Sequence, residues 1–524
     1  MSMSLELIRE VIKVNQVIAE NRTQAIIEND IIVPDVKPDI SRVLLLDGEA
    51  YVNNTEITTD KMHISGTICM KILYSSDDAD QCIKSINTNV AFSESMEMPN
   101  IKAGMKCKVK CEIEHMDYDI LNGRKINIKT ILKFNMKVML ETEQGIVSNV
   151  KEVEDVQVLK DNLKVNCFVG ENSVENIIKE TMEVPAGKPT IKEILRNDIK
   201  ITGKDYKVTE NKIIAKGELN ISTLYICDGE EENIEFMEHE IPFTQLIDFE
   251  GVNENAMCDM EYRVMDSQFE AEEDSDGELR MMNGEIKIHI IAAGYNNKNI
   301  EVVADAYSPH VRLSVEKEPF TVEDIMAENK GQIILKDTMV MGEENPDIAE
   351  VFNVLSKPCF SEIKVLDDKV IIEGVVNNNV LYLANNTEQP VFCFGQEIPF
   401  RHGVDIKGIK PSMNCDADLD IEHCSYSMVS SNEVEIRLVI NLNIKVINKT
   451  VLPLVVRVEE SALETNLFES QPSITIYFTK PGDSLWKIAK SYYTTIDDIQ
   501  NINNLAAHSV LNPGQQVIIP KRSK

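Results

Sequence analysis

Three residues near the end of the first quarter of the chain have side chains that could bind a metal. Cys107, Cys111 and His115 follow one another at intervals of four residues, and thiolate and imidazole groups are the ligands that zinc prefers. They lie in an alternating apolar run, however, and strand residues four apart are about 13 Å apart. That distance is too long for one ion, so the sequence predicts no metal site.

Two short segments near the C-terminus are the other candidates, because each pairs a turn former with polar residues. One consists of Gly482, Asp483, Ser484, Leu485 and Trp486, and the other of Leu511, Asn512, Pro513 and Gly514. Trp486 is the only tryptophan of the chain. Packing within a small domain and anchoring of a partner both fit this residue.

The residues around these loops predict a small βααβ module over residues 474–524. Ile474, Ile476 and Phe478 alternate as they would on a strand, and residues 485–492 have helical spacing. Asp483 or Ser484 can cap this helix and Thr495 a second one. Residues 517–519 supply a returning strand.

This stretch resembles the LysM family. The resemblance implies that the two loops bracket a shallow groove that binds N-acetylglucosamine units of peptidoglycan or chitin. It makes residues 482–485 and 511–514 the candidate residues for binding a glycan or a protein partner, and Trp486 is added as a possible anchor because large rings are enriched at binding hot spots.

Bulk composition narrows the classes of partner and compartment. The 524 residues include 53 basic and 87 acidic ones, a net charge of -34, while residues 475–524 alone are near +3. The acidic remainder would repel nucleic acid, so we expect no nucleic-acid partner. The N-terminus lacks the pattern of a secretory signal, and no segment has the roughly 18 apolar residues of a membrane span. Eleven scattered cysteines without a CxxC pair favour a reducing cytosol.

The acidic body repeats itself three times, at offsets of 151 and then 157 residues. The segment IKVNQVIAEN at 12–21 returns as LKVNCFVGEN at 163–172 and as FTVEDIMAEN at 320–329. Landmarks in the same register are Pro38, Pro189 and Pro346; Lys61, Lys212 and Lys369; Gly66, Gly217 and Gly374; Tyr74, Tyr225 and Tyr382; Phe92, Phe243 and Phe400; and Cys107, Cys258 and Cys415. We infer three homologous domains, 1–148, 149–309 and 310–458, and a linker at 459–473 before the LysM-like module.

Apolar residues alternate with a period of two within each unit, so the fold is predicted to be mainly β. Three antiparallel β domains are expected, and the pattern leaves sandwich and barrel open. Residues 38–44 and their counterparts could form a short helix with Pro at its first position. Residues 270–278, EAEEDSDGE, predict a solvated acidic loop inserted into a hairpin of the second unit.

Several of these landmarks resemble the spore-coat SPOCS family: the Lys-Pro-Asp-Ile opening, the Leu-Tyr strand end, the Ile-Pro-Phe triplet, and Ile-Glu-His at 113–115 and 421–423. Three such units before a LysM domain resemble SipL-type spore coat morphogenetic proteins. The resemblance implies binding to the stage IV morphogenetic ATPase at the forespore surface in the mother-cell cytoplasm. Other coat proteins and peptidoglycan are further candidate partners. The second unit departs from the pattern, with Thr190 in place of Asp and Asp266 in place of His.

No catalytic motif emerges, because the chain has no P-loop, GxGxxG, HExxH or GxSxG sequence. The recurrent cysteines and His115 and His423 are interpreted as structural strand residues. We therefore predict a non-enzymatic coat adaptor with no catalytic residues, metal or cofactor. The alternative is a peptidoglycan-binding protein of cortex or wall. A wall hydrolase is disfavoured because no export signal is seen.

Overall fold

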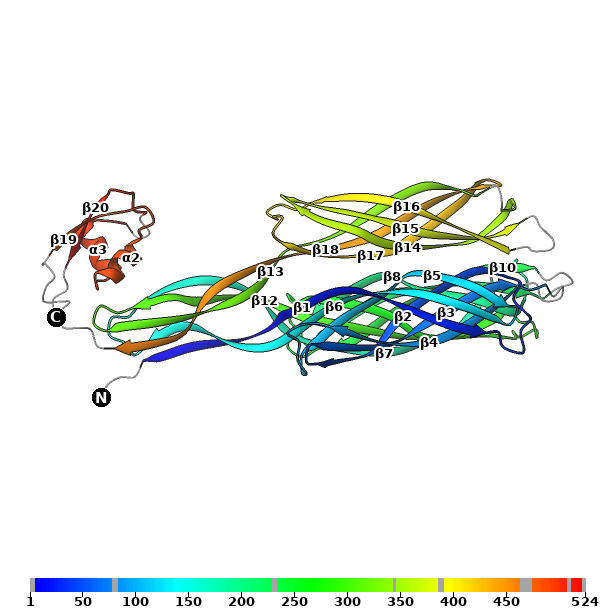
Figure 1. Ribbon diagram of the computed structural model, residues 1–524, viewed down its shortest axis with the longest axis horizontal. Helices are drawn as coiled ribbons and strands as arrows, with labels where there is room; N and C mark the ends of the chain where they lie inside the picture. Colours follow the sequence, from blue (N-terminus) through cyan, green and yellow to red (C-terminus); the bar gives the residue numbers. More distant parts are fainter. Residues whose placement is uncertain are drawn as a thin grey trace.

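The computed structural model describes residues 5–77, 83–228, 233–342, 345–384, 391–461, 474–506 and 510–520. It contains eighteen long strands followed by a small α/β module (Figure 1). The first repeat comprises β1 (Glu6–Ile32), β2 (Arg42–Thr58), β3 (Lys61–Ser75), β4 (Ile83–Glu97), β5 (Lys106–Asn122) and β6 (Lys125–Lys151). The second comprises β7 (Gln157–Glu183), β8 (Ile191–Thr209), β9 (Lys212–Cys227), β10 (Ile234–Asp248), β11 (Met257–Glu272) and β12 (Met281–Tyr307). The third comprises β13 (Arg312–Val340), β14 (Ile348–Leu366), β15 (Lys369–Ala384), β16 (Val391–Asp405), β17 (Asn414–Ser430) and β18 (Glu433–Ser461).

Each repeat folds as two antiparallel three-stranded sheets around its own apolar core. In the first repeat the sheets have the strand orders β1-β6-β5 and β2-β3-β4, and the other two repeats have the same topology. Inward residues of both sheets fill one cluster per repeat. The mainly β prediction is confirmed, and two separate ladders make each repeat a sandwich.

The repeated prolines and tyrosines are joined by one hydrogen bond in every repeat. The buried hydroxyl groups of Tyr74, Tyr225 and Tyr382 donate to the carbonyls of Pro38, Pro189 and Pro346, at 3.0, 3.1 and 3.1 Å. The short helix expected at residues 38–44 is wrong, because the Pro38 carbonyl is engaged by Tyr74 and β2 begins at Arg42.

The repeated glycines and phenylalanines form cross-strand pairs. Gly66, Gly217 and Gly374 lie directly opposite Phe92, Phe243 and Phe400. A Cβ atom at Gly66 would overlap the Phe92 ring and the carbonyl oxygen of Tyr51. These positions therefore accept only glycine without displacing a ring or a neighbouring strand.

The three repeats share further cores around a common axis. The long hairpins β1–β6, β7–β12 and β13–β18 extend beyond the sandwiches and their ends pack together (Figure 1). Equivalent residues meet there: Val147, Val303 and Val455, and Val150, Ala306 and Val458. A second shared cluster lies farther along the hairpins and a third near β2, β8 and β14. The repeats thus form one body with pseudo-threefold symmetry.

A buried arginine links the first two repeats at one of these junctions. Arg196 is 4% exposed and its guanidinium contacts Asp198 at 2.7 Å and Asp47 of the first repeat at 2.8 Å. Burial would raise the pKa of Asp198, but the charges of Arg196 and Lys71 outweigh burial and lower that pKa. The charged network is therefore ionised in the folded protein.

The C-terminal module consists of β19 (Ile474–Phe478), α2 (Leu485–Ser491), α3 (Ile496–Asn503) and β20 (Gln516–Pro520), the expected βααβ order. Of the acidic segment, residues 270–272 belong to β11 and the rest forms the turn before β12. Of the expected linker, residues 459–461 belong to β18, and 462–473 lie outside the described residues. None of the helices in the described ranges is long and apolar enough to span a bilayer.

Replacing Gly66 by alanine should destabilise the first repeat, because the new methyl group would force Phe92 or the β2 backbone to move. We expect a loss of about 1–3 kcal/mol in the free energy of unfolding, measured by denaturant titration. Gly145→Ala is the matched control, since its Cβ would lie 3.6 Å from the nearest atom of Arg9, an ordinary contact. Equal stability of the two variants would contradict the packing role of the Gly–Phe pair.

Arg196→Met should weaken the junction between the first and second repeats, because it leaves Asp198 and Asp47 without their shared cation. Removing one partner of a buried pair costs about 3–5 kcal/mol, so the calorimetric unfolding midpoint should fall. The exposed Arg437→Met serves as control. A midpoint unchanged in both variants would show that the junction does not depend on this network.

Candidate binding site in the C-terminal module

Two similar proline-glycine turns form the candidate site. In the first, the Asp483 amide donates to the Lys480 carbonyl at 3.1 Å, and in the second the Gln515 amide donates to the Asn512 carbonyl at 3.0 Å. Gly482 and Gly514 have φ angles of 84° and 83°. Glycine is favoured there because a type II turn needs a positive φ at its third residue.

Thr479 joins the two turns. Its buried hydroxyl donates to the Asn512 carbonyl at 2.5 Å, and its own carbonyl accepts from the Gly514 amide at 2.7 Å. The two loops that the sequence singled out therefore lie side by side, held by the hydroxyl and the carbonyl of Thr479. Thr479 itself was not predicted, and its position just before the first turn was the only signal for it.

The polar residues of the first loop hold the module together. The Asp483 carboxylate accepts from the Lys480 amide and the Tyr477 hydroxyl, both at 2.8 Å, and these bonds lower its pKa. Ser484 is the N-cap of α2 and accepts from the Lys487 amide at 3.2 Å; Thr495 caps α3. The predicted caps are confirmed.

The remaining predicted residues divide between core and surface. Leu485 is buried and Leu511 partly buried in the module core. Those exposed to solvent are Gly482, Ser484, Asn512, Pro513 and Gly514. A ligand at the two turns would therefore meet backbone groups and the Asn512 side chain. Glycan or protein binding there stays a prediction.

Trp486 lies apart from the turns, against the second repeat. Its indole N–H donates to Asp305 Oδ2 at 2.9 Å, and its ring packs edge-on against Tyr307 with centroids 4.9 Å apart. Lys490 Nζ contacts both oxygens of the same carboxylate, at 2.7 and 2.8 Å. The Tyr307 hydroxyl donates to the Thr494 carbonyl at 2.9 Å. The module is thus docked on the end of β12.

Of the three repeats, only the second has a carboxylate at the position that binds the module. Asp305 follows a bulge in β12, and Asn149 and Arg457 occupy the same place after the bulges of β6 and β18. A neutral amide or a cation cannot pair with Lys490. Burial would raise the pKa of Asp305, but hydrogen bonds from Lys490 and Trp486 outweigh burial and lower it. The charge at this one position selects where the module docks.

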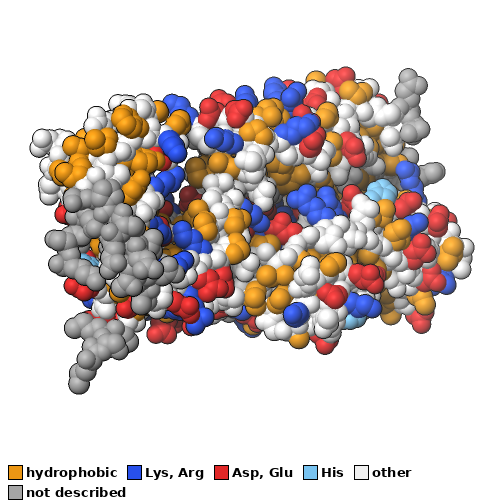
Figure 2. Space-filling model, turned by 60° about the vertical axis from the view of Figure 1, so that its left-hand side comes forward, with side chains coloured by type: hydrophobic (Ala, Val, Ile, Leu, Met, Phe, Trp, Pro, Cys, Tyr) orange, Lys and Arg blue, Asp and Glu red, His pale blue; other side chains and the backbone are white. Residues whose placement is uncertain are grey.

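The outer face of β19 is apolar and exposed. Ile474, Ile476 and Phe478 are each more than half exposed, whereas Tyr477, between the last two, packs on the module core. Hydrophobic side chains gather on this end of the molecule at the upper left of Figure 2. The alternation was visible in the sequence, but only the structure shows which face is left uncovered.

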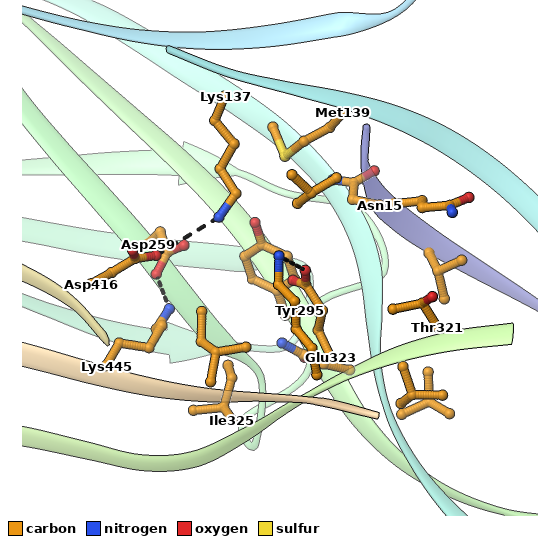
Figure 3. A pocket seen from close by; sticks show the side chains of 18 of the residues that line it. Asn15, Lys137, Met139, Asp259, Tyr295, Thr321, Glu323, Ile325, Asp416 and Lys445 are labelled. Carbon is orange, nitrogen blue, oxygen red and sulfur yellow. Dashed lines mark hydrogen bonds and ion pairs between the residues drawn. The ribbon is translucent and has the colours of Figure 1, made fainter. Parts of the chain in front are cut away.

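A cavity of about 230 Å³ lies where the three repeats meet (Figure 3). Its charged side chains form three ion pairs: Lys137–Asp416 at 3.8 Å, Lys445–Asp259 at 2.5 Å and Lys449–Glu323 at 3.0 Å. The amide oxygens of Asn15 and Asn166 are buried there and have no donor among the residues that the structure describes, as at sites that hold water. We assign the cavity to the packing of the repeats.

The recurrent cysteines and histidines do not converge. Cys107, Cys258 and Cys415 each pack in or against the core of a different repeat. Burial raises the pKa values of Cys258 and Cys415 to about 11, which keeps their thiols protonated at neutral pH. His115 and His423 lie exposed on β5 and β17. Within the described residues, no three His, Cys, Asp or Glu side chains are grouped as around a metal ion.

Asp305→Ala should release the module from its seat, because Trp486 and Lys490 lose their shared acceptor. Trp486 is the only tryptophan, so its emission should shift to longer wavelength and acrylamide should quench it more strongly. Because the pKa of Asp305 is lowered, docking should persist at pH values above about 4, the ordinary pKa of an aspartate. Docking should be lost as the pH falls through the lowered pKa of Asp305. The control is Asp497→Ala, on the exposed first turn of α3; identical spectra for both variants would contradict docking.

Comparison with protein-family models agrees with this architecture. The family described as SipL, SPOCS domain matches residues 39–121, 190–272 and 347–429, and the LysM domain family matches residues 477–520. The three SPOCS matches begin 151 and 157 residues apart, the offsets of the landmarks. No solved structure matches the chain. Both families consist of non-catalytic binding domains. Their matches together cover more than half of this chain. The chain therefore belongs to the SipL-type spore-coat proteins, with three SPOCS domains and a C-terminal LysM domain.

Proposed function

We propose that this chain is a non-enzymatic adaptor of spore coat assembly. It binds the stage IV morphogenetic ATPase, largely through its LysM module, and tethers coat to the forespore surface from the mother-cell cytoplasm. Membership of the family supports a role in the spore coat. Binding of the ATPase, the location at the forespore surface and the lack of catalysis are our proposals. Other coat proteins are further partners.

The observation that carries this proposal is the uncovered apolar face of β19. Ile474, Ile476 and Phe478 point away from the module core, and docking through Trp486 uses a different side of the module. Exposed aliphatic and aromatic side chains on a small rigid module are typical of protein-binding hot spots. Docking to β12 holds this face in one orientation relative to the body.

Replacing Ile476 and Phe478 together by aspartate should weaken ATPase binding by at least about tenfold, the effect of losing roughly 1.4 kcal/mol. The measurement is titration of the purified full-length chain with the ATPase. Asn512→Ala is the matched control, because it changes an exposed residue of the same module outside this face. Wild-type binding by the double variant would reject β19 as the contact.

Peptidoglycan binding is the second candidate, favoured by the two adjacent exposed turns. N-acetylglucosamine units would hydrogen-bond to turn backbone and to Asn512. The chain should then sediment with purified peptidoglycan, Asn512→Ala should reduce this at least several-fold, and the β19 variant should leave it unchanged. Retention of peptidoglycan without ATPase binding would favour this candidate over the adaptor.

A further inference from the structure

The hairpin tips lie at the end of the molecule opposite the LysM module. Strands β6 and β12 are 27 residues long and β18 is 29, and the module docks at the C-terminal end of β12. At about 3.3 Å per residue, the tips where these strands begin lie up to roughly 85 Å away. Figure 1 shows the module and the tips at opposite ends.

Two of the three tips carry exposed aliphatic side chains. In the first repeat Ile32, 69% exposed, lies opposite Lys125, the first residue of β6, and Leu121, 54% exposed, lies in a bulge of β5 next to Asn122, the other partner of Lys125. In the third repeat Val340 lies opposite Glu433, the first residue of β18, and Val429 lies in a bulge of β17 next to Ser430, the other partner of Glu433; both valines are 57% exposed. Ile32 and Val340 are 308 residues apart in the sequence, and so are Leu121 and Val429, so the two pairs occupy equivalent positions in the first and third repeats.

The tip of the second repeat has glutamate at both of these positions. Glu183 and Glu272 lie on either side of Met281 and are exposed. The turn that follows adds four more acidic residues, Glu273, Asp274, Asp276 and Glu278. The first and third repeats therefore present aliphatic groups at their tips, whereas the second repeat, which has a longer turn and no bulge before it, presents a dense negative charge.

Folding does not require the aliphatic groups at these tips. The inward positions beside them are filled by other residues, such as Ile31 and Ile126, which are 7% and 0% exposed. The second repeat closes its hairpin with glutamates at the corresponding sequence positions, although its turn is longer. The four residues lie on edge strands of their sheets, and edge strands usually carry charges that prevent association. Aliphatic pairs at two equivalent places therefore favour contact with a partner.

The net charge of the body favours one class of occupant. The chain before residue 475 has a net charge near -37, and an acidic tip accompanies the two aliphatic ones. A second copy would bring acidic tips and acidic bodies together, and an anionic lipid surface would be repelled as well. A basic protein surface with an apolar patch meets both features.

We propose that the Ile32–Leu121 and Val340–Val429 tips are two equivalent docking sites for a basic coat protein with an apolar patch. This inference rests on the proposed adaptor function and supplies its coat-facing end. The LysM module would contact the forespore side, and the tips would hold the coat layer on the other. Two equivalent sites imply two partner copies per chain.

The test replaces the four tip residues by aspartate in the full-length chain. In sporulating cells a fluorescent fusion of this variant should still form a ring at the forespore, while electron microscopy should show the coat detached from the forespore. The control is Ile177→Asp, an exposed isoleucine of β7 away from the tips. Because the four residues are exposed, the unfolding midpoint should stay near that of the wild type. If it does not, Leu121→Ser with Val429→Ser is tested in the same way.

The outcomes separate this inference from the function on which it rests. A ring with an attached coat in the tip variant overturns the docking sites and leaves the adaptor function intact, whereas a wild-type chain that forms no ring overturns the function itself. Flotation of the wild-type chain, but not the variant, with vesicles of phosphatidylglycerol and phosphatidylcholine would assign the tips to lipid. Sedimentation as a dimer that the variant abolishes would assign them to a second copy. Either result overturns the proposed coat partner.

Discussion

The structure depends on the apolar contacts made where the three long hairpins meet. A two-stranded hairpin that extends beyond its own core has little apolar area to bury and is marginal in water. Here each extension covers the other two, through residues such as Val147, Val303 and Val455. These contacts join three similar sandwiches into one body and carry their shared axis out to the end where the LysM module docks. Together with the shared cluster near β2, β8 and β14 and the Arg196–Asp47 ion pair, they hold the repeats as one body.

Because the three repeats are related by pseudo-symmetry, each surface position occurs three times. The residue type at that position decides which repeat makes a given contact. The position after the strand bulge is Asn149, Asp305 or Arg457 in the three hairpins. Only the carboxylate can accept from Trp486 and pair with Lys490 at the same time. The core positions, by contrast, are nearly alike in the three repeats. Conserved packing therefore builds a common frame, and differences at its surface give each repeat its own contacts.

The local features of the fold could be predicted from the sequence, because they depend on residues that recur in register. Period-two alternation indicated strands, and Gly66 and Phe92 recur because they face each other across β3 and β4. The helix expected at residue 38 failed because its Pro carbonyl is taken by Tyr74, a partner 36 residues away. Capping of the LysM helices by Ser484 and Thr495 was predicted correctly, since caps depend on neighbours in the chain.

The long-range contacts could not be predicted in the same way. Nothing in the local pattern of Asp305 indicates that it will meet Trp486, which lies 181 residues later. Trp486 was equally compatible with packing and with partner binding, and the structure places it in a contact within the chain. The common axis was also hidden, because residues such as Val303 fit a buried strand whether their neighbour is the same repeat or another.

Docking within the chain also explains how a few polar bonds can hold the LysM module. Residues 462–473 connect β18 to β19, so the module stays near its seat whether or not it is bound, and a short connection keeps its effective concentration high. An ion pair, an indole hydrogen bond and one tyrosine contact are then sufficient, although the same set would be weak between separate molecules. Because β19 faces away from this contact, a partner on Ile476 and Phe478 can bind while the module remains docked.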